Sequence, residues 1–380
     1  MTEPLQLLYY CPVSFGGIAE YGNRQCEALA QAGVAVTMLC PSDFPFQSSL
    51  YQQVKSLTQD AKPKQSRLKN RILIFKSLLA DARILDHFIR RQNFKTVLFA
   101  SYGEYLAPLW AWRFRAHAKS GVKFGAVAHD PVRDYVVGPI WWHRWSIAEG
   151  YSFLNEVFVH EPIQLDTGRP VKNLRTTLVP IGPFFFPTPT KNLEELRKEL
   201  GIPQDAPLFL SFGHLRDNKN LDLIIEALTV VKEAWLLVAG TEAPSSQKSS
   251  ADYQKTAESL GVAERCRWRV AFLEANDVSN YFNASDCVLL TYSSSFRSAS
   301  GVLSVAAWFQ KAVIASAGES SLLTLVETYQ LGPVIRPDSS EEIVKGMKSI
   351  MTTEVSPEWS RYEADNSWEK NAEIIIQSLA

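Results

Sequence analysis

Residues Leu210–Leu228 read LSFGHLRDNKNLDLIIEAL, and this stretch decides how the second half of the chain folds. The residues Leu208–Phe212 are apolar and prone to β structure, so they predict a buried strand. Gly213 then allows a tight turn, and Leu221–Lys232 carries apolar residues at helical spacing. A strand that leads through a short turn into an amphipathic helix is the repeating unit of parallel α/β sheets.

The same alternation of strand and helix extends over both halves of the chain. In the first half we expect strands at Leu5–Tyr10, Val34–Cys40, Lys95–Ala100, Lys123–Ala128 and Glu156–His160, and helices at Ile18–Ala32 and Arg67–Arg91. In the second half we expect strands at Leu208–Phe212, Trp235–Ala239, Trp268–Ala271, Cys287–Thr291 and Ala312–Ser316, helices at Leu221–Lys232 and Gly301–Phe309, and a short additional strand at Leu331–Arg336. The pattern predicts an α/β chain with two Rossmann-like, doubly wound domains.

A proline-rich segment separates the two halves. Val179–Thr190 reads VPIGPFFFPTPT and contains four prolines and a glycine, which is typical of a connection between domains. We therefore expect an N-terminal domain over residues 1–182 and a C-terminal domain over residues 191–365. Open α/β sheets bind ligands at the carboxyl ends of their strands, so two such domains facing each other across a cleft suit two substrates.

The bulk composition excludes several classes of protein. A length of 380 residues fits two domains, and a net charge of −1 gives no overall attraction to nucleic acid. The five cysteines are scattered without a CxxC pair, which argues against structural zinc and against a disulfide framework. The start lacks the pattern of a signal peptide, and no stretch reaches the ~18 apolar residues of a spanning helix. We expect a cytoplasmic protein, or one peripheral at the inner face of a membrane.

Arg216 and Lys219 give the turn after Leu208–Phe212 its predicted chemistry. They place two cations between the carboxyl end of a strand and the beginning of a helix. Backbone amides, the helix dipole and two fixed cations all favour a diphosphate at such a point. Two cations can also stabilise a departing diphosphate without a metal. A solvated loop that happens to be basic is the alternative interpretation.

Three further sequences have the composition of ligand sites. Gly16 and Gly17 precede a predicted helix without the GxGxxG spacing, which favours close approach of a ligand over a dinucleotide site. Ser300 is a candidate helix N-cap, and Gly301 leaves room for an anion or a sugar against the first amides. His129 follows the strand Lys123–Ala128 at the carboxyl edge of the first sheet. An ordinary turn, cap or packing role is the alternative at each position. HExxH, DxD, CxxC and GxSxG are absent from the sequence, so we expect no metal and no cofactor.

These motifs, in this order, resemble glycosyltransferase family 4, the retaining enzymes of the glycosyltransferase-B (GT-B) fold. The resemblance covers nearly the whole chain, including KAVIAS at Lys311–Ser316, and it implies a nucleotide-diphosphate sugar as the donor. It assigns Arg216 and Lys219 to the donor diphosphate and His129 to the donor sugar. The donor-binding residues that it implies are Gly16, Gly17, Gly213, Leu273, Ser298, Ser300, Gly301 and Val302. Leu273 belongs to the segment that contacts the nucleotide base, and residues 366–380 resemble the terminal helix that crosses back onto the N-terminal domain.

One part of the pattern differs from most of the family. Two glutamates eight positions apart precede the KPVIAS run in many members, and these positions fall on Arg297 and Val305 here. The chain reads SASGVLSVA instead, similar to a subgroup with a Ser-Gly-Val-Leu stretch. Amides at Ser300, Gly301 and Val302 are then expected to bind phosphate or sugar, with Ser298 or Ser300 replacing a carboxylate.

The resemblance implies a retaining, metal-independent transfer of a sugar to a glycan or to a lipid-linked acceptor, in polysaccharide or glycolipid biosynthesis. The reaction proposed for the family is a front-face attack in which the departing diphosphate acts as the base, so it needs no protein nucleophile. Two alternatives stay open at this point. One is a catalytically degenerate glycosyltransferase-like binding protein, which the missing glutamates favour. The other is a nucleotide-sugar epimerase of the same fold, for which no convincing pair of carboxylates is present.

A basic helix over Arg67–Arg91 suggests a further partner. Its cations Lys69, Lys76, Arg83 and Arg90 recur every seven residues and therefore follow one face. We hypothesise that this helix lies near anionic lipid headgroups, with Trp141, Trp142 and Trp145 as interfacial anchors or acceptor platforms. A solvated basic face with ordinary core tryptophans is the alternative.

Overall fold

The computed structural model describes residues 5–59, 67–129, 131, 136, 138–242, 247–353 and 355–380, without the side chains of residues 67–74. The chain divides into two compact units. Unit 1 comprises Met1–Ile181 with Ser367–Ala380, and unit 2 comprises Gly182–Asn366. The domain bounds predicted from the sequence are 1–182 with 366–380, and 191–365. The division into units assigns the linker residues 182–190 to unit 2.

Unit 1 contains a parallel sheet whose strands, among the described residues, follow the order β3-β2-β1-β4-β5-β6-β7. The strands are β1 (Gln6–Tyr10), β2 (Ala35–Pro41), β3 (Gln52–Leu57), β4 (Thr96–Phe99), β5 (Lys123–Ala128), β6 (Glu156–Val159) and β7 (Arg175–Leu178). The central strands β1, β4 and β6 are almost wholly buried because helices cover both faces of the sheet.

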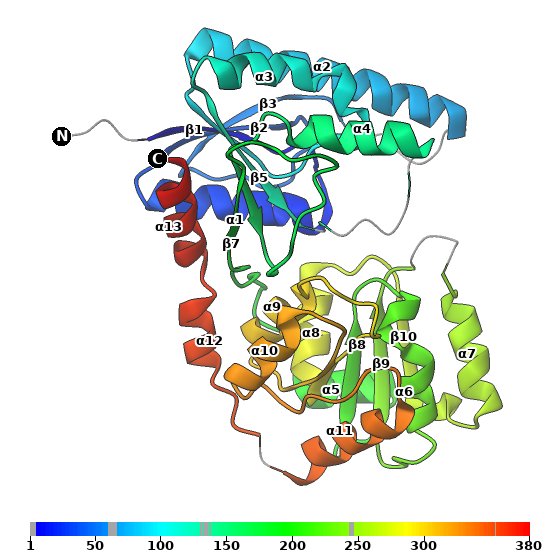
Figure 1. The fold of residues 1–380 in the computed structure, drawn as a ribbon. Helices are drawn as coiled ribbons and strands as arrows, with labels where there is room; N and C mark the ends of the chain where they lie inside the picture. The colour runs from blue at the N-terminus through cyan, green and yellow to red at the C-terminus, as the bar shows by residue number, and fades with distance from the viewer. Residues whose placement is uncertain are drawn as a thin grey trace. The chain divides into compact units, whose positions relative to one another are not determined.

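Two separate cores lie on the two faces of this sheet. On one face α1 (Gly16–Gln31) packs with α13 (Trp368–Leu379), and on the other lie α2 (Arg67–Gln92), α3 (Ala111–Lys119), α4 (Ile140–Tyr151) and the 3-10 helix η1 (Glu104–Leu109) (Figure 1). Buried hydrogen bonds fix α13 on α1: the Gln25 amide donates to Asn371 Oδ1 at 2.7 Å, and Asn371 Nδ2 donates to the Tyr21 hydroxyl at 2.9 Å. The last helix of the chain is therefore an integral part of unit 1.

Unit 2 has a smaller parallel sheet with the described strand order β10-β9-β8-β11-β12. Its strands are β8 (Leu208–Phe212), β9 (Trp235–Gly240), β10 (Cys266–Val270), β11 (Cys287–Thr291) and β12 (Val313–Ser316). Its helices are α5 (Leu193–Leu200), η2 (Asp217–Lys219), α6 (Leu221–Ala227), α7 (Ser250–Ser259), η3 (Ala263–Arg265), α8 (Ala275–Ala284), α9 (Gly301–Trp308), α10 (Ser321–Thr328), α11 (Ser340–Thr352) and α12 (Trp359–Asp365). One core contains residues of α5, α8 and α9, and the other contains residues of α6, α7 and α11.

The predicted fold class, α/β with two parallel sheets, is confirmed. Three local predictions are wrong. Strands β3 (QQVKSL) and β7 (RTTL) were not expected, because they are polar edge strands without an apolar run. The strand predicted at Leu331–Arg336 makes a single bridge, Ala315 to Val334, because Gly332 and Pro333 interrupt it. The helix predicted over Leu221–Lys232 ends at Ala227, just before the run Thr229–Val231, whose β-branched side chains lower helix propensity.

Candidate functional site

The turn between β8 and α6 owes its shape to two glycines. Gly213 has φ +95°, and its amide donates to the Ala239 carbonyl oxygen at 2.9 Å. Gly240, at the end of β9, has φ +148°, and a Cβ there would lie 2.0 Å from the Gly213 carbonyl oxygen. The turn therefore lies directly against the end of the neighbouring strand, at a distance that leaves no room for a side chain on Gly240.

The Lys219 side chain folds back over this turn. Its Nζ donates to the Phe212 carbonyl oxygen. A Cβ on Gly213 would lie 3.2 Å from this Nζ. Burial, and then the charge of nearby Arg216, lower the pKa of Lys219 to about 7. Arg216 itself is exposed at the start of η2. A half-buried cation next to a second cation gains when an anion binds, so the turn is prepared for negative charge.

The beginning of α9 lies beside the turn. Val302 Cγ2 is 3.8 Å from the position that a Cβ on Gly213 would occupy, and the space where a Cβ of Gly301 would lie is open. Ser300 occupies the predicted N-cap position of α9, but its side chain makes no capping hydrogen bond. The Ser300 hydroxyl instead shares a 2.9 Å hydrogen bond with the hydroxyl of Tyr292, whose ring stacks on Phe296 at 3.9 Å.

Backbone contacts join the turn to the loop after β11. The Ser293 amide donates to the Asn218 carbonyl oxygen at 2.8 Å. The Thr291 hydroxyl donates to the Lys219 carbonyl oxygen at 3.2 Å. These contacts fix the position of the backbone at Asn218 and Lys219.

Asp338, which the sequence did not single out, links the same two segments. Its Oδ1 accepts from the Asn220 side chain at 3.1 Å, and its Oδ2 accepts from the Ser294 amide at 3.0 Å. Burial acts to raise the pKa of Asp338, but the hydrogen bonds from Ser294 and Asn220 outweigh it and lower the pKa below its usual value. Asp338 precedes α11 and is far from the turn in sequence, so no motif could have indicated this contact.

The other predicted donor residues of unit 2 lie further along the same sheet edge. Leu273 follows β10, two strands away from β8, and its side chain packs partly into the core. Its neighbour Phe272 is 76% exposed. Ser298 lies in the loop between β11 and α9, where its carbonyl oxygen accepts from the Ser320 hydroxyl at 3.1 Å. The structure thus brings Gly213, Lys219 and Val302 together. Leu273 and Ser298 lie at the same edge of the sheet, but other residues separate them from this group.

Three predicted residues belong to unit 1. Gly16 begins α1 with φ +71°, and a Cβ on Gly16 or Gly17 would meet no atom within 4 Å. Both glycines are exposed, and the N-cap residue Phe15 makes no side-chain cap. The beginning of α1 is therefore accessible to a ligand.

His129 follows β5 and packs against aromatic rings. Its Nε2–H donates to the Ala100 carbonyl oxygen at 3.1 Å, and its ring meets Tyr21 edge-on at 4.6 Å. Burial, and then the neighbouring His160, lower the pKa of His129 to about 3, so the ring is neutral near pH 7. Asp130, the next residue of the predicted motif, lies outside the described residues.

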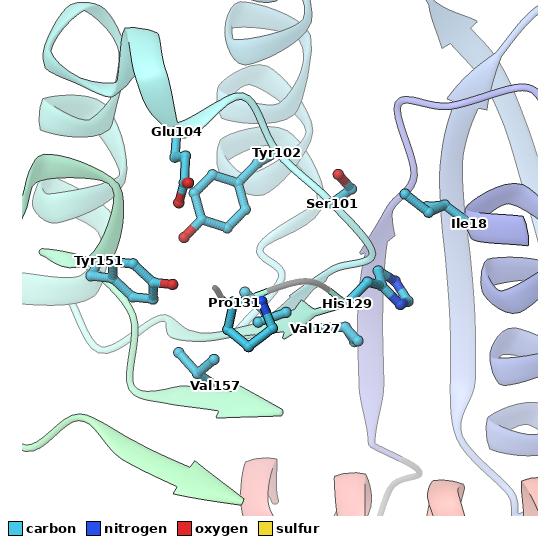
Figure 2. A pocket seen from close by; sticks show the side chains of 11 residues that line it. Ile18, Ser101, Tyr102, Glu104, Val127, His129, Pro131, Tyr151 and Val157 are labelled. Atoms are coloured by element: carbon cyan, nitrogen blue, oxygen red, sulfur yellow. The ribbon is translucent and has the colours of Figure 1, made fainter. Parts of the chain in front are cut away.

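A cavity of about 220 Å³ lies beside His129 in unit 1 (Figure 2). The polar groups that face it come from β5, from the segment after β4 and from α4. The residues that line it are Ile18, Ser101, Tyr102, Glu104, Ala126, Val127, Ala128, His129, Pro131, Tyr151 and Val157. Figure 2 shows the Glu104 carboxylate and the hydroxyls of Tyr102 and Tyr151 on one side of it, and His129 on the other. The sequence indicated His129 but gave no sign of Glu104, Tyr102 or Tyr151.

Comparisons with known proteins agree with this geometry. Residues 192–374 match the family described as glycosyl transferases group 1. The comparison with curated proteins gave no significant match.

Several solved structures share the fold of the whole chain. Sucrose-phosphate synthase from Thermosynechococcus elongatus has a TM-score of 0.70 and 17% identity, over 98% of this chain and 97% of that one. Anabaena HepE in complex with UDP has a TM-score of 0.68 and 15% identity, over 98% and 99%. WaaG, a glycosyltransferase of lipopolysaccharide biosynthesis, has a TM-score of 0.59 and 16% identity, over 96% and 94%. Residues 192–374, which carry the Arg216–Lys219 turn, thus match the glycosyl transferases group 1 family, and the whole chain shares the two-sheet GT-B fold of solved glycosyltransferase structures.

Proposed function

We propose that this chain is a retaining glycosyltransferase that moves a sugar from a nucleotide-diphosphate donor to a glycan or lipid-linked acceptor, without a metal. The observation that carries the proposal is the β8–α6 turn, where half-buried Lys219 lies near exposed Arg216 in the segment that matches the group 1 family. The diphosphate oxygens accept charge-assisted hydrogen bonds from both side chains. Amides at the beginning of α9 add further donors, and together these groups stabilise the charge that develops as the diphosphate departs.

A uridine nucleotide is the first donor to test, because the solved complexes of HepE contain UDP and UDP-glucose. A thermal-shift screen with UDP, GDP and ADP and their sugars tests the proposal directly. A ligand at 100 times its dissociation constant stabilises the folded protein by about 2.7 kcal/mol. We expect UDP or UDP-sugars to give the largest shift. If no nucleotide raises the unfolding temperature, the proposal is wrong. Binding without release of UDP in the presence of acceptors would favour a degenerate, non-catalytic protein.

Nucleotide affinity should depend on pH through Lys219. Its pKa of about 7 means that the free protein loses this proton as the pH rises through neutrality. A bound diphosphate favours the charged ammonium, so binding takes up a proton and the affinity falls as the pH rises. We expect a decrease of up to about tenfold per pH unit between about pH 7 and pH 9. Calorimetry of UDP binding in buffers of different ionisation enthalpy measures the uptake. An affinity that stays constant over this range would contradict the assignment, and a Lys219→Ala variant should lack the dependence.

The membrane hypothesis now has a second, structural observation in its support. None of the helices in the described ranges combines the length and apolarity required to span a bilayer. On α4, however, Trp141 is 62% and Trp145 is 45% exposed, whereas Trp142 donates to the Tyr105 carbonyl oxygen at 3.0 Å. Exposed tryptophan is typical of membrane-interface contacts. On α2 the side chains of Lys76, Arg83 and Arg90 are exposed, while that of Lys69 lies outside the described side chains.

We expect the chain to float with vesicles that contain anionic lipid and to stay unbound with neutral vesicles. Replacing Trp141 and Trp145 with serine should reduce the bound fraction several-fold. The double variant Lys76→Glu and Arg83→Glu, with both tryptophans intact, should also have a smaller bound fraction than the unaltered chain. Lys198→Glu, at an exposed position of α5 in unit 2, is the matched control. If the unaltered chain does not bind anionic vesicles, peripheral membrane contact is excluded under those conditions.

A further inference from the structure

We propose that the cavity beside His129 binds one uncharged sugar ring of the acceptor, with the Glu104 carboxylate accepting hydrogen bonds from its hydroxyls. This inference rests on the proposed function, because it takes the second substrate to be a carbohydrate. It assigns a chemical class and a set of contacts to that substrate, which neither the family match nor the solved structures specify.

The fold places Glu104 at the cavity by a close contact between helices. Glu104 begins η1, and α4 passes directly over it at Gly150. A Cβ on Gly150 would lie 3.2 Å from Glu104 Cβ and 3.4 Å from the Tyr102 ring. The missing side chain of Gly150 therefore lets α4 approach η1 closely, and this approach brings Tyr151 to the same cavity.

The two tyrosines are held in defined positions. The Tyr102 ring packs edge-on against Phe99 at 5.6 Å and against Trp110 at 5.9 Å. Tyr151 is buried at the end of α4. Because both rings are fixed by packing, their hydroxyls face the cavity at little cost in side-chain entropy when a ligand binds (Figure 2).

The chemistry of this wall selects the class of ligand. A carboxylate only accepts hydrogen bonds, and it can accept short, charge-assisted ones from adjacent hydroxyl groups such as those of a sugar. The same negative charge repels a phosphate or a uronic acid. Two phenol hydroxyls can both donate and accept, and Ile18, Val127 and Val157 offer apolar contacts to ring C–H groups.

The size of the cavity agrees with a single ring. A volume of about 220 Å³ is somewhat larger than that of an engineered cavity of about 150 Å³ that binds one benzene ring. A space of this size can hold a monosaccharide ring of about a dozen non-hydrogen atoms. We therefore infer that the sugar that receives the transfer enters this cavity.

Saturation-transfer NMR with free methyl glycosides tests the inference. The probes are the methyl glycosides of glucose, galactose, mannose and glucuronic acid, each at millimolar concentration with the full-length chain. We expect at least one neutral glycoside to bind and the glucuronide not to bind. Glu104→Ala and Tyr151→Phe should each weaken the neutral probe, the former by about tenfold or more, because hydrogen bonds to a charged group are the stronger ones. Glu104→Gln should lose less affinity and should begin to admit the glucuronide.

Two measurements keep the outcomes distinct. Glu369→Gln, on the exposed side of α13, is the matched control and should bind the probes as the unaltered chain does. Each variant must retain the unfolding temperature and the UDP affinity of the unaltered chain. If UDP binds but no neutral glycoside does, or if Glu104→Ala leaves glycoside binding unchanged, this inference is overturned while the proposed function stands. If none of UDP, GDP and ADP binds, the proposed function fails, whatever the glycosides do.

Discussion

Replacing Lys219 with alanine is expected to weaken UDP binding by about 100-fold, and Arg216→Ala by about tenfold. Hydrogen bonds to charged groups contribute roughly 1.5–3 kcal/mol each, and the larger value applies where solvent is excluded. Lys219 is the half-buried member of the pair, while Arg216 is exposed and more strongly screened. The two losses should therefore differ, although the two side chains carry the same charge.

Calorimetric titration with UDP measures both affinities. Lys198→Ala, which removes an exposed lysine of α5 in the same unit, is the control and should leave the affinity within about twofold. The turnover number should fall together with the affinity, because the same cations neutralise the departing diphosphate. Unchanged UDP binding in Lys219→Ala would show that the ammonium does not contact the nucleotide, and the assignment of the β8–α6 turn would fail with it.

The sequence predicted this turn well because all of its parts are local. The strand Leu208–Phe212, the glycine and the first residues of α6 lie close together in the sequence, and the bounds of the strand and the helix agree with the structure except at the end of the helix. The groups that fix the turn come from elsewhere. Asp338 and Gly240 contact it from other strands and loops, and side-chain periodicity carries no information about such long-range pairs.

The same reasoning explains the misses in unit 1. Glu104 and Tyr151 lie far apart in the chain, and each has an ordinary local sequence. They meet only because η1 and α4 pack together at Gly150, and a lone glycine inside a helix does not reveal what approaches it. Ser300 differs from these residues because it does have a local signal, and it occupies the predicted N-cap position. The expected side-chain cap is nevertheless absent at this residue. Its hydroxyl is taken by Tyr292, a partner outside the helix.

Gly240→Ala should be the most destabilising single substitution considered for unit 2. A φ of +148° is a conformation that residues with a Cβ rarely adopt, and the new Cβ would lie 2.0 Å from the Gly213 carbonyl oxygen. Because that oxygen belongs to the backbone, a side-chain rotation cannot relieve the overlap. We expect a loss of about 3 kcal/mol or more, which for a unit of this size lowers the unfolding temperature by roughly 6–12 °C.

Gly261→Ala separates the two causes of this effect. Gly261 also has a positive φ, +68°, but a Cβ there meets no atom within 4 Å. Its substitution should therefore cost only the backbone strain, about 1–2 kcal/mol. Thermal unfolding compares the two variants, and UDP titration of the folded Gly240→Ala protein adds a second readout. If the turn moves to relieve the overlap, it displaces Lys219 from its position over Gly213, and UDP affinity falls even where the variant remains folded. Equal unfolding temperatures for the two variants would mean that β9 and the turn are not in the close contact on which the anion site depends.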